Sequence, residues 1–167
     1  MTTSNALPEI SFRPVLQEDR AFLFQVYAST RETELAPVPW TPEQKIAFLA
    51  QQFEAQDLDY HRNYGDAEFL VIRVDGRDAG RLYVLRSPAD IMIIDIALLP
   101  GETGRGVGTR ILGDLMTEAD ASGRTISLHV ENFNPARRLY QRLGFSAKEE
   151  TGVYLHLIRE PGAAQVS

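Results

Sequence analysis

The sequence predicts an α+β fold in which helices cover a mixed, mainly antiparallel sheet. β-rich segments joined by turn residues run from residue 67 to residue 99, a pattern typical of an antiparallel meander. The order strand, helix, strand between residues 91 and 130 indicates a parallel crossover, because tight turns cannot join parallel strands. The 167 residues are enough for one domain, with residues 1–8 and 161–167 expected as loose tails.

The N-terminal part predicts one strand and two helices. Residues 10–14 alternate in polarity, and the proline at their end stops the strand. A helix is expected over 18–30, followed by a loop at 34–40 that two prolines keep extended. The second helix begins after Thr41, a good N-cap, has a proline at its first position, and continues to about residue 63.

The middle of the chain predicts a hairpin and a central strand. Segments 67–74 and 78–85 are joined by Asp75-Gly76, a dipeptide that favours a two-residue hairpin turn. Residues 91–99 form an almost continuously apolar run, which indicates a buried strand.

The next element is an amphipathic helix. It opens at about Thr109 and ends near Gly123, which is expected at the C′ position. Its inner face is formed by Ile111, Leu112, Leu115, Met116 and Ala119.

The C-terminal part predicts a strand, a short helix and a closing hairpin. The strand covers 125–130, and Asn134 and Pro135 then supply the cap and the first residue of the helix. Residues 145–148 and 153–159 are expected to pair as the last hairpin.

Composition excludes several classes of protein. The net charge is −6 and no block of basic residues occurs, which argues against nucleic acid or an anionic membrane as a partner. The absence of cysteine excludes disulfides and thiol nucleophiles. The N-terminus lacks a secretory signal and no apolar run is long enough to cross a bilayer, so we expect a cytoplasmic protein. His61 and His156 have no partners at metal-ligand spacing, and no metal site is expected.

The loop at 101–108 has the features of an anion site. Its glycines allow tight turns and a close approach of the backbone to a ligand. The loop leads into a helix N-terminus, where unpaired N–H groups and the helix dipole favour a phosphate. Arg105 and Arg110 are expected to add positive charge. The alternative is a plain glycine-rich turn between strand and helix.

Two common phosphate motifs do not fit this loop. The P-loop pattern fails because Val107-Gly108, rather than lysine and serine or threonine, follows Gly106. The dinucleotide fingerprint begins with Gly104 and Gly106, but its sixth position is Thr109. A nucleotide-binding oxidoreductase is therefore disfavoured.

Two segments, about residues 91–146 in all, resemble motifs of the GNAT superfamily of acyl-CoA-dependent N-acyltransferases. Thr103-Gly104-Arg105-Gly106-Val107-Gly108 is similar to motif A, Arg/Gln-x-x-Gly-x-Gly/Ala, with Thr103 as a departure at the first position. The second segment, similar to motif B, is Asn134-Pro135-Ala136-Arg137-Arg138-Leu139-Tyr140-Gln141-Arg142-Leu143-Gly144-Phe145.

The resemblance implies a single-domain GNAT-like fold, with six to seven strands and about four helices. The strands ending near Leu98 and Val130 would diverge, and the pantetheine arm of acetyl-CoA would lie between them. Asn134 would add a hydrogen bond to the cofactor. The residues expected to bind acetyl-CoA are Ile96, Ala97, Leu98, Thr103, Gly104, Arg105, Gly106, Val107, Gly108, Thr109, Asn134 and Tyr140.

Acyl transfer to an amine needs a base, an oxyanion donor and a proton for the leaving thiolate. By the resemblance, Tyr140 matches the motif B tyrosine and would protonate or orient the thiolate. Its phenol, with a pKa near 10, is protonated at neutral pH. The alternative is a half-buried aromatic residue in the core. The oxyanion donor is expected to be a backbone N–H near Ala97 or Leu98.

Asp95 is the first candidate for the base. A carboxylate in an apolar strand must be paired, hydrogen-bonded or at a cleft, and burial would raise its pKa toward a base's range. The alternative is an ion pair with Arg73 or Arg81. Glu131, at the end of the parallel strand, is the second candidate, whereas His129 is expected to be a partly exposed strand residue.

These observations predict an N-acetyltransferase in which a primary amine attacks acetyl-CoA directly in a ternary complex. The alternative is a non-catalytic acyl-CoA sensor or regulatory module on the same fold. The acceptor, a small-molecule or peptide amine, would be bound by Tyr27, Trp40, Tyr64 and Tyr83. Amino acids, polyamines, aminoglycosides, peptide N-termini and protein lysines all remain open, as does a monomer or a homodimer.

Overall fold

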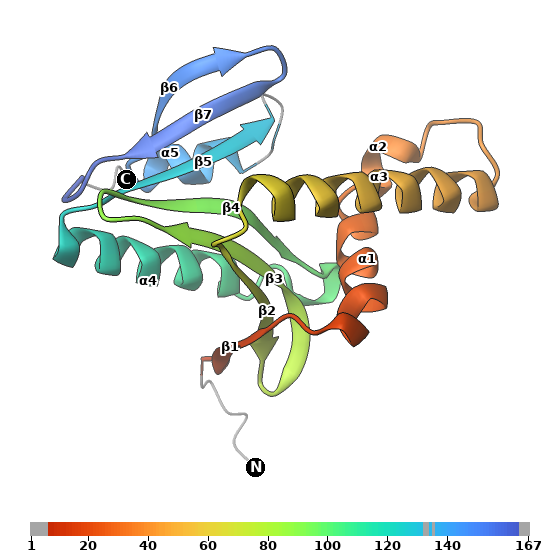
Figure 1. Ribbon diagram of the computed structural model, residues 1–167, viewed down its shortest axis with the longest axis horizontal. Coiled ribbons are helices and arrows are strands. Elements are labelled where there is room, and N and C mark those ends of the chain that lie inside the picture. The colour runs from red at the N-terminus through yellow and green to blue at the C-terminus, as the bar shows by residue number, and fades with distance from the viewer. Residues whose placement is uncertain (1–6, 132–133, 135, 164–167) are drawn as a thin grey trace. The chain divides into compact units, whose positions relative to one another are not determined.

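The computed structural model describes residues 7–131, 134 and 136–163 (Figure 1). Within these residues, seven strands form one sheet in the order β1-β2-β3-β4-β5-β7-β6. The strands are β1 (Ile10–Pro14), β2 (Glu68–Val74), β3 (Arg77–Arg86), β4 (Asp90–Leu98), β5 (Thr125–Glu131), β6 (Ser146–Thr151) and β7 (Tyr154–Arg159). The helices are α1 (Arg20–Ser29), α2 (Glu32–Leu35), α3 (Pro42–Asn63), α4 (Val107–Ser122) and α5 (Arg137–Arg142), with 3₁₀ turns η1 (Gln17–Asp19) and η2 (Pro100–Glu102).

The sheet is mixed, as the sequence predicts. β1 with β2, β5 with β7, and β6 with β7 pair antiparallel, whereas β4 and β5 pair parallel. The parallel pair is the crossover expected from the strand, helix, strand order, since α4 connects the two strands. The predicted α+β fold is confirmed.

The chain divides into two compact units. The first unit comprises residues 1–82 and 96–108, and the second comprises residues 83–95 and 109–167. β3 and β4 therefore each contribute to both units.

The first unit contains the long helix α3, which begins and ends where the sequence predicts. The Thr41 hydroxyl accepts from the Gln44 N–H at 3.1 Å, and the Gln44 side chain accepts from the Thr41 N–H at 2.9 Å. This capping box satisfies two backbone donors at the helix start. α3 and α1 pack through a small core of Leu23, Tyr27, Leu49 and Phe53.

The second unit packs α4 through the apolar face that the sequence predicts, and all five residues of that face are buried. Gly123 follows the helix with φ of 67°, as a C′ glycine should. At the start of the parallel pair, the Asp90 carboxylate accepts from the Ser127 and Thr125 hydroxyls, both at 2.6 Å. These bonds hold the register of β4 against β5.

Arg159, at the end of β7, is a deeply buried ion-pair partner in the second unit, with 2% of its surface exposed. Its guanidinium donates to both carboxylate oxygens of Asp120 on α4, at 2.8 and 3.2 Å, and to the Leu143 carbonyl at 3.2 Å. The Gly162 N–H donates to the same carboxylate at 2.7 Å. One arginine thus ties the last strand to the ends of α4 and α5.

Several boundaries differ from the sequence prediction, and β6 for example continues to Thr151 rather than ending at 148. The first helix begins with the 3₁₀ turn η1, and the expected loop at 34–40 contains the end of the short helix α2. An ion pair from Arg31 to Glu34 at 3.1 Å supports α2, and both prolines lie beyond it. α4 begins at Val107, two residues earlier than expected, and α5 begins at Arg137 rather than directly after the Asn134 cap.

Some predictions fall outside the described residues. They concern Pro135 and most of the tails expected at residues 1–8 and 161–167.

Among the described helices, none combines the length and hydrophobicity needed to span a membrane. Over the same part of the chain, no group of three or more His, Asp or Glu side chains is arranged to hold a metal ion.

We expect Asp120→Asn to weaken the fold in a pH-dependent manner. Hydrogen bonding, first from Arg159 and then from Gly162, lowers the pKa of Asp120 from 3.8 to about 2. Because the native pKa lies below the unfolded value, ionised Asp120 stabilises the fold above about pH 4, and this contribution is lost as the pH falls from 3.8 towards 2. Urea unfolding should show a gap between wild type and variant that is full at pH 7 and shrinks over this range.

Asp114→Asn is the matched control, because Asp114 is an exposed residue of the same helix. It should change the free energy of unfolding little at any pH. A gap for Asp120→Asn that stays constant between pH 7 and pH 2 would contradict the assignment.

Candidate active site

The glycine loop has a fixed start and an open face. Where β4 ends, the Leu99 N–H donates to the Ala79 carbonyl at 2.9 Å, and the turn η2 follows. Gly104 and Gly106 then adopt φ of 78° and 76°, a region that side chains disfavour. A Cβ built on either glycine would meet no atom within 4 Å. The backbone here is therefore accessible to a ligand.

The loop leads directly into the first turn of α4. Val107, the first helical residue, is buried and anchors the turn, and Gly108 and Thr109 follow within the helix. The first N–H groups of a helix have no partner inside it, and the dipole makes this end positive. Gly108 lies at an ordinary 3.9 Å from the Leu98 side chain, measured from a built Cβ. The left-handed glycines and the helix start together fit a phosphate-bearing group.

Thr103 uses its side chain within the loop. Its hydroxyl donates to the Pro100 carbonyl at 2.8 Å, and its N–H approaches the same oxygen at 3.4 Å. The residue that departs from motif A thus closes the η2 turn.

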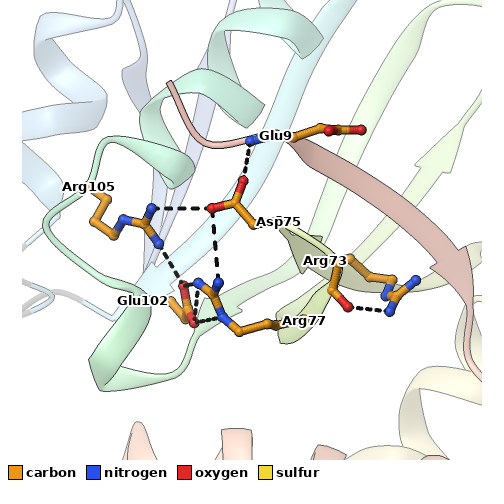
Figure 2. A network of polar contacts seen from close by, with 7 residues as sticks. Glu9, Arg73, Asp75, Arg77, Glu102 and Arg105 are labelled. Carbon is orange, nitrogen blue, oxygen red and sulfur yellow. Dashed lines mark hydrogen bonds and ion pairs between the residues drawn. The ribbon is translucent and has the colours of Figure 1, made fainter. Parts of the chain in front are cut away.

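A network of four charged side chains connects the loop with the β2–β3 hairpin (Figure 2). Arg77 donates to both carboxylate oxygens of Glu102, each at 3.1 Å through Nη2. Arg105 lies 3.4 Å from Glu102 and 3.4 Å from Asp75. The positive charge expected from Arg105 is therefore balanced by two carboxylates, which in turn also face Arg77.

Tyr140 lies on α5 with 7% of its surface exposed, and its ring packs edge-on against Phe145 at 5.7 Å. Burial raises the pKa of Tyr140 above its ordinary value of 10, and the negative charge of Asp95 raises this pKa further. The phenol is thus firmly protonated at neutral pH. It can donate a proton but is a poor base.

Asp95 is half-buried on β4, in the same unit as Tyr140. The parallel ladder ends at the pair Ile93 and Leu128, and both strands continue beyond it. The divergence of the two strand ends stays a prediction. Arg73, one of the partners considered for Asp95, lies 3.2 Å from Asp78. The roles of Asp95 stay predictions.

Glu131 and Asn134 flank the segment between β5 and α5. Glu131 is half-buried, and its backbone carbonyl accepts from the Asn134 N–H at 2.9 Å. The Asn134 side chain accepts from the Ala136 N–H at 2.8 Å, which stabilises the turn before the helix. By backbone geometry, however, the N-cap is Ala136. Asn134 therefore caps the turn that leads into α5.

The four aromatic residues expected to bind the acceptor lie in different environments. Tyr27 and Tyr83 are buried, and Tyr27 packs on Phe53 with its ring centroid at 5.8 Å. Trp40 is 42% exposed and packs edge-on against a neighbouring phenylalanine, and Tyr64 is half-buried at the end of α3. Trp40 and Tyr64 present surface to solvent, whereas Tyr27 belongs to the core of the first unit.

Comparison with known proteins now identifies the family. The family model described as "Acetyltransferase (GNAT) family" matches residues 19–145. The chain belongs to this GNAT acetyltransferase family. No curated protein sequence matches the chain.

Solved structures support the same GNAT fold. The PaiA N-acetyltransferase from Thermoplasma acidophilum, solved in complex with coenzyme A, is 17% identical, with a TM-score of 0.67 over 91% of this chain and 99% of that chain. A GCN5-related N-acetyltransferase from Rhodopseudomonas palustris is 20% identical, with a TM-score of 0.64 over 96% and 99%. An acetyltransferase from Thermus thermophilus is 17% identical, with a TM-score of 0.62 over 90% and 96%.

Sequence reasoning missed one position that shapes this GNAT site. A Cβ on Gly80 of β3 would lie 2.1 Å from the Ala97 carbonyl oxygen and 3.0 Å from Leu98. Only glycine lets the two strands come so close. An isolated glycine inside a strand pattern indicates such an approach, and that signal was present at Gly80. The charged network around Glu102 gave no signal, because it joins the glycine loop to a hairpin about 25 residues earlier in the sequence.

We expect Gly80→Ala to destabilise the protein by at least about 2 kcal/mol, because the new methyl group would overlap backbone atoms that cannot move aside. Gly113→Ala is the control, since a Cβ at this α4 position meets no atom within 4 Å and should stabilise the helix by roughly 0.5 kcal/mol. Thermal and urea unfolding measure both. Equal stabilities for wild type and Gly80→Ala would show that the strands do not depend on this contact.

We expect Asp95→Asn to lower the pKa of Tyr140. The Asp95 charge raises this pKa, although less than burial does, so its removal leaves a value still above 10. NMR titration of protein labelled with ¹³C-tyrosine measures the shift, and Tyr140→Phe assigns the signal. Asp114→Asn should leave the titration unchanged. An unchanged Tyr140 pKa in Asp95→Asn would contradict the prediction, because it would show that the Asp95 charge does not act on the Tyr140 phenol.

Proposed function

We propose that this GNAT protein transfers an acetyl group from acetyl-CoA to a primary amine. The observation that carries the proposal is the loop with two left-handed glycines, an open face and a helix start directly behind it. The T. acidophilum relative was solved with coenzyme A, which supports the same class of ligand here.

The loop amides would supply most of the binding. Backbone N–H groups from Gly104 to Thr109 can donate to the pyrophosphate, and the dipole of α4 adds to them. Arg105 contributes less than a free arginine would, because two carboxylates balance it. On β4, Ile96, Ala97 and Leu98 would contact the pantetheine arm, and an N–H near Ala97 or Leu98 would stabilise the developing oxyanion.

Acetyl-CoA supplies an activated thioester, and the chain's own residues handle the protons. Tyr140 would donate its phenolic proton to the departing sulfur; its raised pKa keeps the phenol protonated before the reaction but also makes it a weaker acid. Asp95, or alternatively Glu131, would accept the proton that the ammonium group must lose before attack. A direct attack fits the sequence because no cysteine is present to carry the acyl group.

The acceptor class proposed is a small-molecule or peptide amine. The net charge of −6 suits a cationic acceptor. Trp40 and Tyr64 are the aromatic side chains among the four candidates that solvent reaches best. We further propose a cytoplasmic monomer or homodimer that acts without a nucleic-acid or membrane partner.

Calorimetric titration with acetyl-CoA tests the proposal first, with CoA and NAD as comparators. We expect affinity in the micromolar range for acetyl-CoA and no signal for NAD. Amines are then screened by thiol release. Absence of acetyl-CoA binding would overturn the proposal, and binding without turnover of any amine would favour the alternative of an acyl-CoA sensor.

With an active amine in hand, Tyr140→Phe should lower kcat about 100-fold, since it removes a positioned proton donor. The dissociation constant of acetyl-CoA should change little, because the ring and its packing remain. Tyr60→Phe, which removes a hydroxyl from α3, is the control and should leave kcat unchanged. An unaltered kcat in Tyr140→Phe would remove Tyr140 from the proton-transfer step.

A further inference from the structure

The β2–β3 hairpin reaches the glycine loop through charged side chains, although it lies about 25 residues earlier in the sequence. The contact centres on Glu102, whose side chain is 13% exposed, whereas its partner Arg77 is 51% exposed. Arg77 forms a forked contact, with Nε at 3.3 Å and Nη2 at 3.1 Å from the Glu102 carboxylate. Forked arginine contacts of this kind fix direction as well as distance.

The hairpin is itself firmly held. Asp75 and Gly76 both adopt left-handed φ, 50° and 80°, as expected of a tight two-residue turn. The Asp75 carboxylate accepts from the Glu9 N–H at 2.9 Å, and the Asp75 N–H donates to the Glu9 carbonyl at 2.8 Å. The other carboxylate oxygen of Asp75 faces Arg105. The hairpin can therefore serve as a fixed support for the loop.

The loop needs such a support. Cβ atoms built on Gly101, Gly104 and Gly106 would meet nothing within 4 Å, so no neighbouring side chain packs on these positions from that side. Glycine also loses the most backbone entropy on ordering. The Glu102 and Arg105 side chains thus provide the polar contacts that connect the two arms of the loop with the hairpin.

The signs of these charges distinguish support from direct binding. Two carboxylates close to a pyrophosphate site would repel a polyanionic ligand. Glu102 and Asp75 lie at the loop nonetheless, each facing both Arg77 and Arg105. The two positive and two negative charges cancel, so the set is better suited to holding the backbone than to attracting phosphate.

From this geometry we propose that Glu102 and Arg77 are positioning residues that hold the glycine loop in its ligand-binding shape, with Asp75 and Arg105 as the second pair. The role in acetyl-CoA affinity rests on the proposed function, whereas the ordering of the loop does not. Exposed ion pairs add little to global stability. A loop that is ordered before binding nevertheless lowers the entropic cost of association.

Calorimetric titration of Glu102→Ala with acetyl-CoA is the decisive test, because the two explanations predict opposite changes in affinity. Charge alone predicts tighter binding, because the variant removes a negative charge near the phosphates. The positioning role predicts binding weakened about five- to tenfold, as loss of a coupled ion pair would give. Arg77→Ala should weaken binding similarly, and the swapped double variant Arg77→Glu with Glu102→Arg should recover part of the affinity.

Glu18→Ala is the matched control, because Glu18 is an exposed glutamate of η1 in the same unit. It should leave the affinity unchanged. The melting temperature of Glu102→Ala should stay close to that of wild type, which separates a loop effect from general unfolding. Unchanged or tighter acetyl-CoA binding by Glu102→Ala would overturn the proposal.

Hydrogen exchange of the free proteins keeps the two proposals separable. Amides of residues 101–106 should exchange several-fold faster in Glu102→Ala than in wild type, whether or not acetyl-CoA proves to be the ligand. If wild type does not bind acetyl-CoA, the proposed function fails while this readout still tests the support. Equal amide exchange rates in both proteins would overturn the proposed ordering of the loop by Glu102, whatever the result for acetyl-CoA binding.

Discussion

The close approach of β3 and β4 at Gly80 is the constraint on which the site depends. Because Gly80 has no side chain, the Ala97 carbonyl can lie where a Cβ would otherwise be. One residue away on β3, the Ala79 carbonyl accepts from the Leu99 N–H and so fixes the point at which the chain leaves the sheet. The left-handed residues Gly104 and Gly106 follow a few residues after that exit point. Backbone contacts thus fix the point at which the loop begins.

Side-chain charge has a different task at this loop. A basic loop would attract any polyanion, whereas the four ionic groups at this loop cancel and leave recognition to directed N–H groups. Hydrogen bonds from Glu9 and then from Arg105 lower the pKa of Asp75, so this carboxylate remains ionised well below neutral pH. Thr103 stands where motif A has arginine or glutamine. Its side chain likewise shapes the loop, because its hydroxyl closes the η2 turn.

Local signals explain how much of the fold was predictable. Thr41 with its following proline located α3, Asp75-Gly76 located the hairpin, and Gly123 located the end of α4, because each acts through neighbours a few residues away. The glycine loop was found for the same reason. The bond from Arg77 to Glu102 joins distant residues and left no pattern in the sequence. The acceptor-binding role of Tyr27 stays a prediction, and the structure shows this side chain buried against Phe53.

The electrostatic link between Asp95 and Tyr140 bears on how the proposed proton transfers are timed. While Asp95 is ionised, its charge raises the pKa of Tyr140 and so holds the phenolic proton. If Asp95 accepts the ammonium proton, that charge disappears and the pKa of Tyr140 falls. The phenol then becomes a stronger acid after the amine has become a nucleophile, when the leaving sulfur needs a proton. Burial, the larger cause, acts throughout and prevents premature loss of the proton.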